Sequence, residues 1–289
     1  MATRILILQK KCWVIVLTNR LDKIFQNLKA KNEKALITFS VSGYPDEETS
    51  LEICKAISDS GAHIHELNIP HEEAQADGPI IQLANIESIN NGITLDKTIN
   101  IASKLRTYNS ELGICLMGYL NNIFIYGIEK FAKKINEAGV DAVICVDLPT
   151  DVKEEKELNS ALKKYEIALI KLITPTTADQ RIKEIVKDAS GFLYSVNLKG
   201  ITGVKTAQVT EANNQVKKIK KHTNLPVVAG FGIKTEEDVK SFSKSDCSGI
   251  VIGSAIIQKI TESVKKNEDK HIVANVIRDY CKRIIKILN

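Results

Sequence analysis

Eight strand-like runs alternate with helical patterns along this sequence, and they predict a single α/β domain folded as a (β/α)₈ TIM barrel. Several of the runs are almost continuously apolar, as parallel strands that are covered on both faces should be. No Gly-x-Gly-x-x-Gly follows the first run, and no Gly/Ser-rich linker divides the units. These absences count against the main alternative, a doubly wound sheet that binds a dinucleotide.

The elements can be assigned in order from their periodicity. An amphipathic helix over Leu21–Ala30 is expected to open the fold. The strand-like runs are Ala35–Ser42, His63–Pro70, Leu112–Leu120, Asp141–Pro149, Ala168–Pro175, Gly191–Leu198, Pro226–Ile233 and Gly249–Ser254. The helical patterns are Glu47–Ser60, Leu95–Tyr108, Ile123–Ala138, Asp151–Tyr165, Ala178–Asp188, Thr210–Lys221, Glu236–Ser245 and Glu268–Leu288. A further helix-like run follows the turn signal Asp77-Gly78-Pro79.

Composition excludes several classes of protein. At 289 residues and 44% apolar side chains, the chain can bury a large core. No apolar run approaches the roughly 20 residues of a membrane-spanning helix, so we expect no membrane insertion. The net charge of +5 is modest, and the lysines of Val216–His222 fit the solvated face of a helix better than a nucleic-acid site. The six cysteines form no Cys-x-x-Cys pair and are expected to be reduced.

Residues 1–19 stand apart from the predicted barrel, which would occupy residues 20–289. They contain Arg4, Lys10 and Lys11, no acidic residue, and two short apolar patches. A targeting peptide is one interpretation, although a secretory signal would have one longer apolar core and a small-residue cleavage site. We therefore expect an extension outside the fold, of unknown role.

Two acidic residues close to the second strand are candidate acid–base groups. Glu66 lies near the end of that strand, and Asp77 lies on the loop beyond it. In a barrel of this kind, the chemistry gathers on the loops after the strands, so both carboxylates could face one pocket. An unpaired carboxylate on an apolar strand is costly, which favours a functional explanation for Glu66. Such a pair suits acid–base work on a small molecule.

Glycine-containing turns follow the last strands. Gly232 follows the seventh strand, and Gly253-Ser254 follows the eighth. Glycine lets the backbone approach a ligand closely, and N–H groups at a helix start bind phosphate. Either turn alone could merely redirect the chain from strand to helix. Together they favour a phosphate site, because barrel enzymes often bind phosphate on these two loops.

Spaced motifs in this sequence resemble the tryptophan synthase alpha chain family. They are Gly43-Tyr44-Pro45, His65-Glu66-Leu67, Ala76-Asp77-Gly78-Pro79, Asp147-Leu148-Pro149, Gly200-Ile201-Thr202-Gly203 and Ala229-Gly230-Phe231-Gly232-Ile233. The motifs occur in order between about Leu21 and Ile260. The resemblance implies a (β/α)₈ lyase of tryptophan biosynthesis. Such an enzyme cleaves indole-3-glycerol phosphate to indole and glyceraldehyde 3-phosphate in a retro-aldol reaction.

The resemblance also implies roles for particular residues. Glu66 would be the general acid/base that protonates the indole ring and receives the proton of a glycerol hydroxyl, while Asp77 would bind the indole N–H. Tyr194 matches the active-site tyrosine and Phe39 would pack against the indole, although on pattern alone both could be plain core aromatics. The positions that match the phosphate-binding residues are Gly203, Phe231, Gly232, Gly253 and Ser254. Thr202 matches a loop threonine that meets the second carboxylate on closure.

Two loops depart from the family pattern. After the catalytic strand the chain reads Pro70-His71-Glu72-Glu73-Ala74 where Pro-Phe-Ser-Asp-Pro is usual, and Asn68 replaces a usual glycine. On the sixth loop the chain reads Asn197-Leu198-Lys199-Gly200, so the usual arginine is absent. These departures affect the two loops that, by resemblance, close over the substrate and meet the partner subunit. Lys199 is a candidate for the missing positive charge.

The expected partner, by resemblance, is a pyridoxal-phosphate tryptophan synthase beta chain in an αββα heterotetramer. No metal or organic cofactor is expected on this chain, because His63 and His65 share the strand face opposite to Glu66 and no third ligand is evident. The compartment would be the cytoplasm or, if the richness in Lys, Ile and Asn reflects an organelle genome, the plastid stroma (chloroplast).

Two alternative functions stay open at this point. One is a different phosphate-binding barrel lyase or isomerase. The other is a barrel that has lost activity and survives as a binding and activating subunit. The presence of both Glu66 and Asp77 argues against the second alternative.

Overall fold

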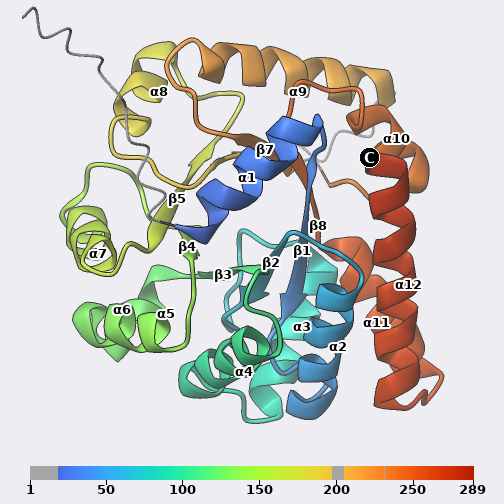
Figure 1. Ribbon diagram of the computed structural model, residues 1–289. Helices are drawn as coiled ribbons and strands as arrows, with labels where there is room; N and C mark the ends of the chain where they lie inside the picture. Colours follow the sequence, from blue (N-terminus) through green and yellow to red (C-terminus); the bar gives the residue numbers. More distant parts are fainter. Residues whose placement is uncertain (1–18, 197–204, 231) are drawn as a thin grey trace, which may run out of the picture.

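The computed structural model describes residues 19–196, 205–230 and 232–289. Eight parallel strands close into a barrel in the order β1 to β8, and helices surround it (Figure 1). The predicted (β/α)₈ barrel is therefore confirmed. No helix in the described ranges is long and apolar enough to cross a bilayer.

Each strand lies inside one of the predicted runs. The strands are β1 (Ala35–Val41), β2 (Ile64–Asn68), β3 (Gly113–Gly118), β4 (Ala142–Cys145), β5 (Ala168–Ile173), β6 (Leu193–Val196), β7 (Val227–Gly230) and β8 (Gly249–Ile252). The helices are α1 (Arg20–Lys31), α2 (Glu47–Asp59), α3 (Pro79–Asn90), α4 (Leu95–Tyr108), α5 (Leu120–Tyr126), α6 (Ile128–Glu137), α7 (Lys153–Lys163), α8 (Asp179–Ile185), α9 (Lys205–Lys220), α10 (Glu236–Phe242), α11 (Ser254–Lys265) and α12 (Lys270–Leu288).

Two helix predictions need correction. The single helix predicted over Ile123–Ala138 is wrong, because Gly127 adopts a φ of +91° and divides it into α5 and α6. Helix α11 was absent from the predicted set, since the strand-like run was extended to Ser254 whereas β8 ends at Ile252. The apolar side chains of α11 cover the outer face of the barrel instead of continuing the sheet.

Helix α1 lies across the amino-terminal end of the barrel (Figure 1). Its buried Leu21, Phe25 and Leu28 join the apolar side chains that fill the barrel interior. Gly113, at the start of β3, makes room for α1, because a Cβ there would lie 2.8 Å from Leu21 Cδ2. The bottom of the barrel is thus closed by packing, which leaves the carboxyl ends of the strands as the open face.

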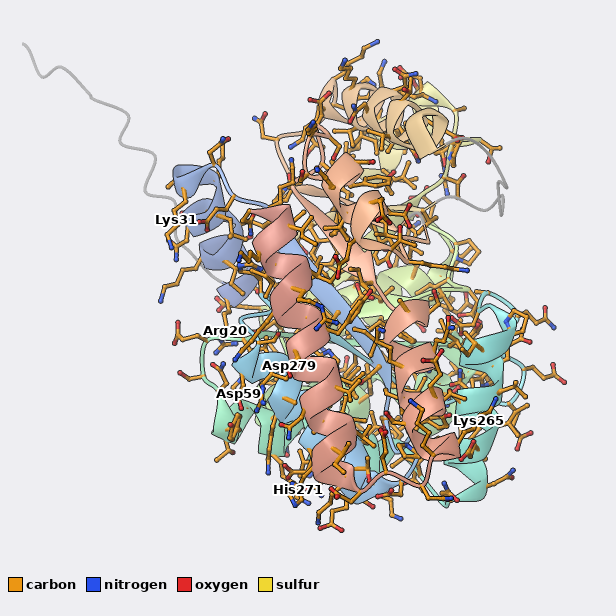
Figure 2. All side chains as sticks on the ribbon, turned by 90° about the vertical axis from the view of Figure 1, so that its right-hand side faces the viewer. Arg20, Lys31, Asp59, Lys265, His271 and Asp279 are labelled. Atoms are coloured by element: carbon orange, nitrogen blue, oxygen red, sulfur yellow. The ribbon has the colours of Figure 1, made fainter. Side chains whose placement is uncertain are left out.

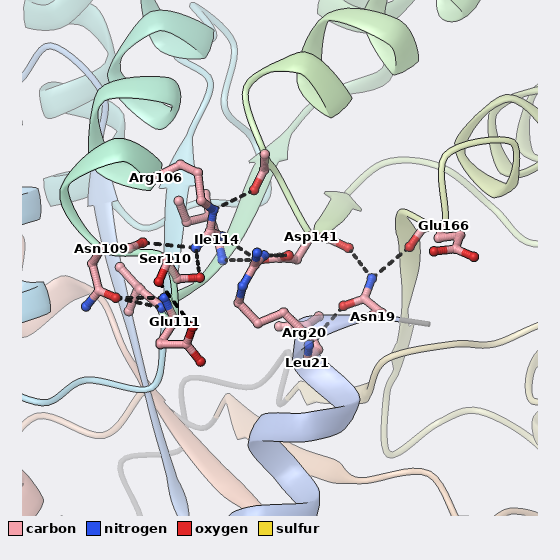
Figure 3. A network of polar contacts seen from close by, with 12 residues as sticks. Asn19, Arg20, Leu21, Arg106, Asn109, Ser110, Glu111, Ile114, Asp141 and Glu166 are labelled. Carbon is pink, nitrogen blue, oxygen red and sulfur yellow. Dashed lines mark hydrogen bonds and ion pairs between the residues drawn. The ribbon is translucent and has the colours of Figure 1, made fainter. Parts of the chain in front are cut away.

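A polar network holds α1 in this position (Figure 3). Asn19 caps the helix, and its side-chain amide donates to the backbone oxygens of Asp141 and Glu166, both at 2.8 Å. The buried Asp141 carboxylate pairs with Arg20 of α1 and with Arg106 of α4. These contacts fix the start of the domain to the start of β4.

The carboxyl-terminal helix α12 runs along the outside of the barrel beside α11 (Figure 2). It also packs on α2, and its buried Ile277, Cys281 and Ile284 belong to the large core between helices and strands. The five cysteines within the described residues are all buried and free of disulfide bonds.

Candidate active site

Glu66 lies inside the barrel on β2, level with Phe39 of β1 and Cys115 of β3. Its side chain is fully buried, and neither carboxylate oxygen has a hydrogen-bond partner among the residues that the structure describes. Burial raises the pKa of Glu66 to about 8, because the apolar surroundings disfavour the charged form. The group therefore carries a proton at neutral pH and can donate it.

Asp77 lies on the loop between β2 and α3. The Tyr119 hydroxyl donates to Asp77 Oδ2 at 3.1 Å, and the same hydroxyl accepts from the Ala76 N–H at 2.9 Å. Burial raises the pKa of Asp77, and the hydrogen bond from Tyr119 opposes part of that rise. The carboxylate is thus held in position by a residue that directly follows the neighbouring strand β3.

Tyr119 was absent from the residues predicted for the site. It directly follows β3 and precedes α5, which is the kind of position where barrel enzymes carry functional groups. That position was the one signal in the sequence that could have identified it. The ring also stacks on His71, with ring centroids 4.7 Å apart and planes 23° apart.

Tyr194 is close enough to both carboxylates for their charges to act on it. It lies on β6, across the barrel from β2, and its ring is packed near Phe192 at 6.4 Å. Burial raises the pKa of Tyr194, and the charges of Glu66 and Asp77 raise it further. The phenol is therefore within Coulombic reach of both carboxylates, so the structure brings these three predicted residues together.

Phe39 lies on the other side of Glu66. The residue is 3% exposed, and it is level with Glu66 in the register of β1 with β2. A Cβ on Gly253 would lie 3.2 Å from Phe39 Cβ and Cδ1, so the ring side packs against the turn after β8. Phe39 thus lies between Glu66 and the predicted phosphate-binding turn at Gly253.

Helix α11 begins at Ser254, directly after that turn. A helix start carries backbone N–H groups without intrahelical partners, together with the positive end of the helix dipole. Gly232, on the preceding loop, has a φ of +64° and open space around its Cβ position. The other predicted residues of this part of the site, Thr202, Gly203 and Phe231, lie outside the described residues, as do Leu198 and Lys199.

The altered loop after β2 is tied to α3. Gln82 Nε2 donates to the backbone oxygens of Ala74 at 3.1 Å and Asp77 at 3.0 Å. The amide oxygen of Asn85 accepts from the His71 N–H at 3.2 Å and from Asn68 Nδ2 at 2.7 Å. Gln82 therefore holds the backbone at Asp77, and Asn85 holds the part of the loop that departs from the family pattern.

The two histidines on β2 and before it contact hydroxyls and backbone. His65 is fully buried, with Nδ1 at 2.9 Å from Thr38 Oγ1 and Nε2 at 3.0 Å from Ser40 Oγ. Burial lowers the pKa of His65 to about 4, so the ring is neutral. His63 Nδ1 accepts from the Leu36 N–H at 3.0 Å. Within the described ranges, no group of His, Cys, Asp and Glu side chains is arranged to hold a metal ion.

The chain is similar to known proteins over most of its length. A family model described as "Tryptophan synthase alpha chain" matches residues 25–285. The structure resembles the tryptophan synthase alpha chain of Legionella pneumophila subsp. pneumophila, at 32% identity and a TM-score of 0.82, covering 93% of this chain and 97% of that one. It also resembles tryptophan synthase subunit alpha of L. pneumophila str. Paris, at 31% identity and a TM-score of 0.83, covering 93% and 98%. Tryptophan synthase from M. tuberculosis in its aminoacrylate-bound form shares the fold at 23% identity, with a TM-score of 0.82 and coverage of 94% and 100%.

Proposed function

The chain belongs to the tryptophan synthase alpha chain family, carbon–carbon lyases that cleave indole-3-glycerol phosphate in tryptophan biosynthesis, and we propose that Glu66 and Asp77 carry that reaction here. Indole leaves its carbon chain only when the ring can accept the electrons of the breaking bond. The reaction therefore needs an acid that protonates the ring and a negative charge that stabilises the resulting cation.

Glu66 supplies the proton in this proposal. The protonated carboxyl donates to the indole ring carbon that bears the glycerol chain, and the ring becomes a cation with its charge centred on the nitrogen. A pKa of about 8 supports this role, because the acid is still protonated at neutral pH. The resulting carboxylate then takes the proton of the adjacent glycerol hydroxyl. The carbonyl of glyceraldehyde 3-phosphate forms as the carbon–carbon bond breaks and its electrons restore the aromatic ring.

Asp77 accepts the indole N–H and stabilises the positive charge of the ring. The hydrogen bond from Tyr119 supports this assignment, because it fixes the carboxylate before the substrate arrives. Such preorganised charge avoids rearrangement of polar groups during the reaction. Tyr194 and Phe39 would line the pocket in which the indole ring lies between Glu66 and Asp77.

The phosphate of the substrate would bind beside α11. The turn at Gly232 leaves open space for the phosphate, and Gly253 lets the backbone approach it closely. Ser254 adds a hydroxyl at the start of the helix. By resemblance, Thr202, Gly203 and Phe231 would complete this part of the site.

A tryptophan synthase beta chain in an αββα heterotetramer is the proposed partner. Phe124 and Ile125 on α5 are 59% and 77% exposed, which is unusual for large apolar side chains. Ile125 lines a cavity of about 490 Å³ together with His71 and Glu72 from the loop after β2. A partner that covered this surface would bury the apolar side chains beside the loop that carries Asp77.

The plastid stroma or the cytoplasm is the proposed compartment, on the composition of the sequence alone.

One observation carries the proposed mechanism: Glu66 is a fully buried carboxyl group without a hydrogen-bond partner in the described residues, in the same mouth as Asp77. The test is indole release from indole-3-glycerol phosphate by the purified protein, with and without a beta chain. Glu66→Gln should lower turnover at least about 100-fold, as loss of a general acid does. Glu129→Gln, a change of an exposed carboxylate on α6, should leave it unchanged.

Equal turnover by the parent and Glu66→Gln would contradict the assigned role. If the parent released no indole under either condition, the inactive, activating barrel would become the better description.

A further inference from the structure

We propose that Asn68 contacts the substrate, with its amide oxygen accepting a hydrogen bond from the hydroxyl on the second carbon of the glycerol chain. This inference rests on the function proposed above, and it adds a specificity residue to that site. It starts from an atom that the fold leaves without a partner.

The amide orientation of Asn68 is fixed by its neighbours. Asn85 Oδ1 must face the His71 N–H, which can only donate, and Asn85 Nδ2 must face the Ile81 oxygen, which can only accept. Asn68 therefore has to present its Nδ2 to Asn85 Oδ1, at 2.7 Å. A flip of the Asn68 amide would place two acceptors against each other, so Oδ1 is the atom that points elsewhere.

Asn68 Oδ1 is buried, and it has no hydrogen-bond donor among the residues that the structure describes. The whole side chain is 0% exposed. A buried amide oxygen without a donor costs free energy, and native proteins rarely carry one without a reason. The two oxygens of Glu66, two residues earlier, are unpartnered in the same way.

The position of Asn68 matches a place on the substrate. Residues two apart on a strand share a face, so Asn68 stands on the interior side of β2 with Glu66, roughly 6–7 Å closer to the mouth. The register places it level with Val41 of β1 and Met117 of β3. It is thus the next polar group that a ligand resting on Glu66 would meet along β2.

The donors of the substrate can be matched to acceptors in turn. Indole-3-glycerol phosphate carries the indole N–H and two hydroxyl groups, and its ionised phosphate adds only acceptors. Asp77 accepts a hydrogen bond from the indole N–H. Glu66 accepts one from the hydroxyl on the carbon that becomes the aldehyde. The hydroxyl on the second carbon has no assigned acceptor. Besides the two oxygens of Glu66, Asn68 Oδ1 is a further oxygen of β2 without a donor among the described residues.

The experiment compares two substrates on two enzymes. The second substrate is the analogue that lacks only the hydroxyl on the second carbon, which can still undergo the retro-aldol cleavage. The parent should prefer the natural substrate by roughly 5- to 10-fold in kcat/KM, the size of one neutral hydrogen bond. Asn68→Gly, and independently Asn68→Ala, should reduce this preference to about one.

A thermal unfolding curve for each variant records any purely structural effect of Asn68. Such an effect would change kcat/KM for both substrates equally. An unchanged preference in Asn68→Gly and Asn68→Ala would overturn the inference, as would a parent that cleaves both substrates equally well. A parent that cleaves neither would instead refute the proposed function itself.

Discussion

The ring of Tyr194 fills the space that a side chain on Gly230 would need. A Cβ on residue 230 would lie 2.2 Å from Tyr194 Cε1 and 3.1 Å from its hydroxyl oxygen. The two residues are on neighbouring strands, β6 and β7. Only a glycine at position 230 lets the phenol take its place within reach of Glu66 and Asp77.

Gly230→Ala should therefore displace the Tyr194 ring. We expect overpacking to lower the free energy of unfolding by about 1–3 kcal/mol, and turnover of indole-3-glycerol phosphate to fall with it. Urea unfolding and indole release measure the two effects. Gly230→Ala should cost little stability when it is made in a Tyr194→Ala background, because the clashing ring is absent there, while activity stays low. Full activity in Gly230→Ala would contradict the assigned position of the phenol.

The pKa of Glu66 predicts a pH dependence of catalysis. The proposed first step needs the protonated acid, so kcat/KM should fall as the pH rises through about 8. The profile should be measured for indole release from about pH 4 to about pH 10, a range that covers both the ordinary carboxyl pKa and the raised one. A decline that begins near pH 5 would show that Glu66 is ionised in the free enzyme and would rule out this first step.

Glu66 should also make the stability of the protein depend on pH. Folding raises its pKa from 4.5 to about 8, so between these values the folded state holds a proton that the unfolded chain has lost. Stability therefore falls as the pH rises through this window and levels off above it. Glu66→Gln should remove the loss, with a gain on the order of a few kcal/mol at pH 8.5 and little change at pH 4. Urea unfolding at both pH values tests this, and Glu129→Gln is the control.

Tyr119→Phe isolates the hydrogen bond that holds Asp77. The ring that stacks on His71 is kept, and only the hydroxyl that reaches Asp77 Oδ2 is removed. We expect turnover to drop by roughly 10-fold, because Asp77 is no longer held before the substrate binds. The free energy of unfolding should fall by about 1–3 kcal/mol, since the hydrogen bonds to Asp77 and from the Ala76 N–H are both lost. A matching drop with Tyr126→Phe, whose hydroxyl contacts Asp96 on the outside of the barrel, would point to a general effect instead.

A buried ion pair outside the site predicts strongly coupled effects on stability. Lys171 of β5 and Glu155 of α7 contact each other, and their side chains are 6% and 7% exposed. Lys171→Met or Glu155→Leu alone should cost about 3–5 kcal/mol, since each leaves one charge buried without its partner. The double variant should be close to the parent in a urea titration. Additive losses in the double variant would show that the pair does not act as a unit.

Much of this fold could be predicted from local patterns. Almost continuously apolar runs such as Leu112–Leu120 are typical of strands covered on both faces, and the eight strand-like runs close into a barrel. The acidic pair Glu66 and Asp77 was also identifiable, because a carboxylate on an apolar strand needs a functional explanation. Gly127 shows the limit of this approach, since the helical periodicity continues through a residue that ends one helix and starts another.

The sequence by itself determined the barrel, its order of strands and the chemical types at its mouth, because these follow from periodicity and residue type, which are local properties of the chain. Only the tertiary structure decided that Tyr119 holds Asp77, that Gly230 makes room for Tyr194, that Lys171 faces Glu155 and that Asn68 Oδ1 lacks a donor. The physical reason is that hydrogen bonds, steric exclusion and ion pairing act over a few ångströms between atoms. Which atoms come that close is set by closure of the barrel, which brings together residues far apart in the chain.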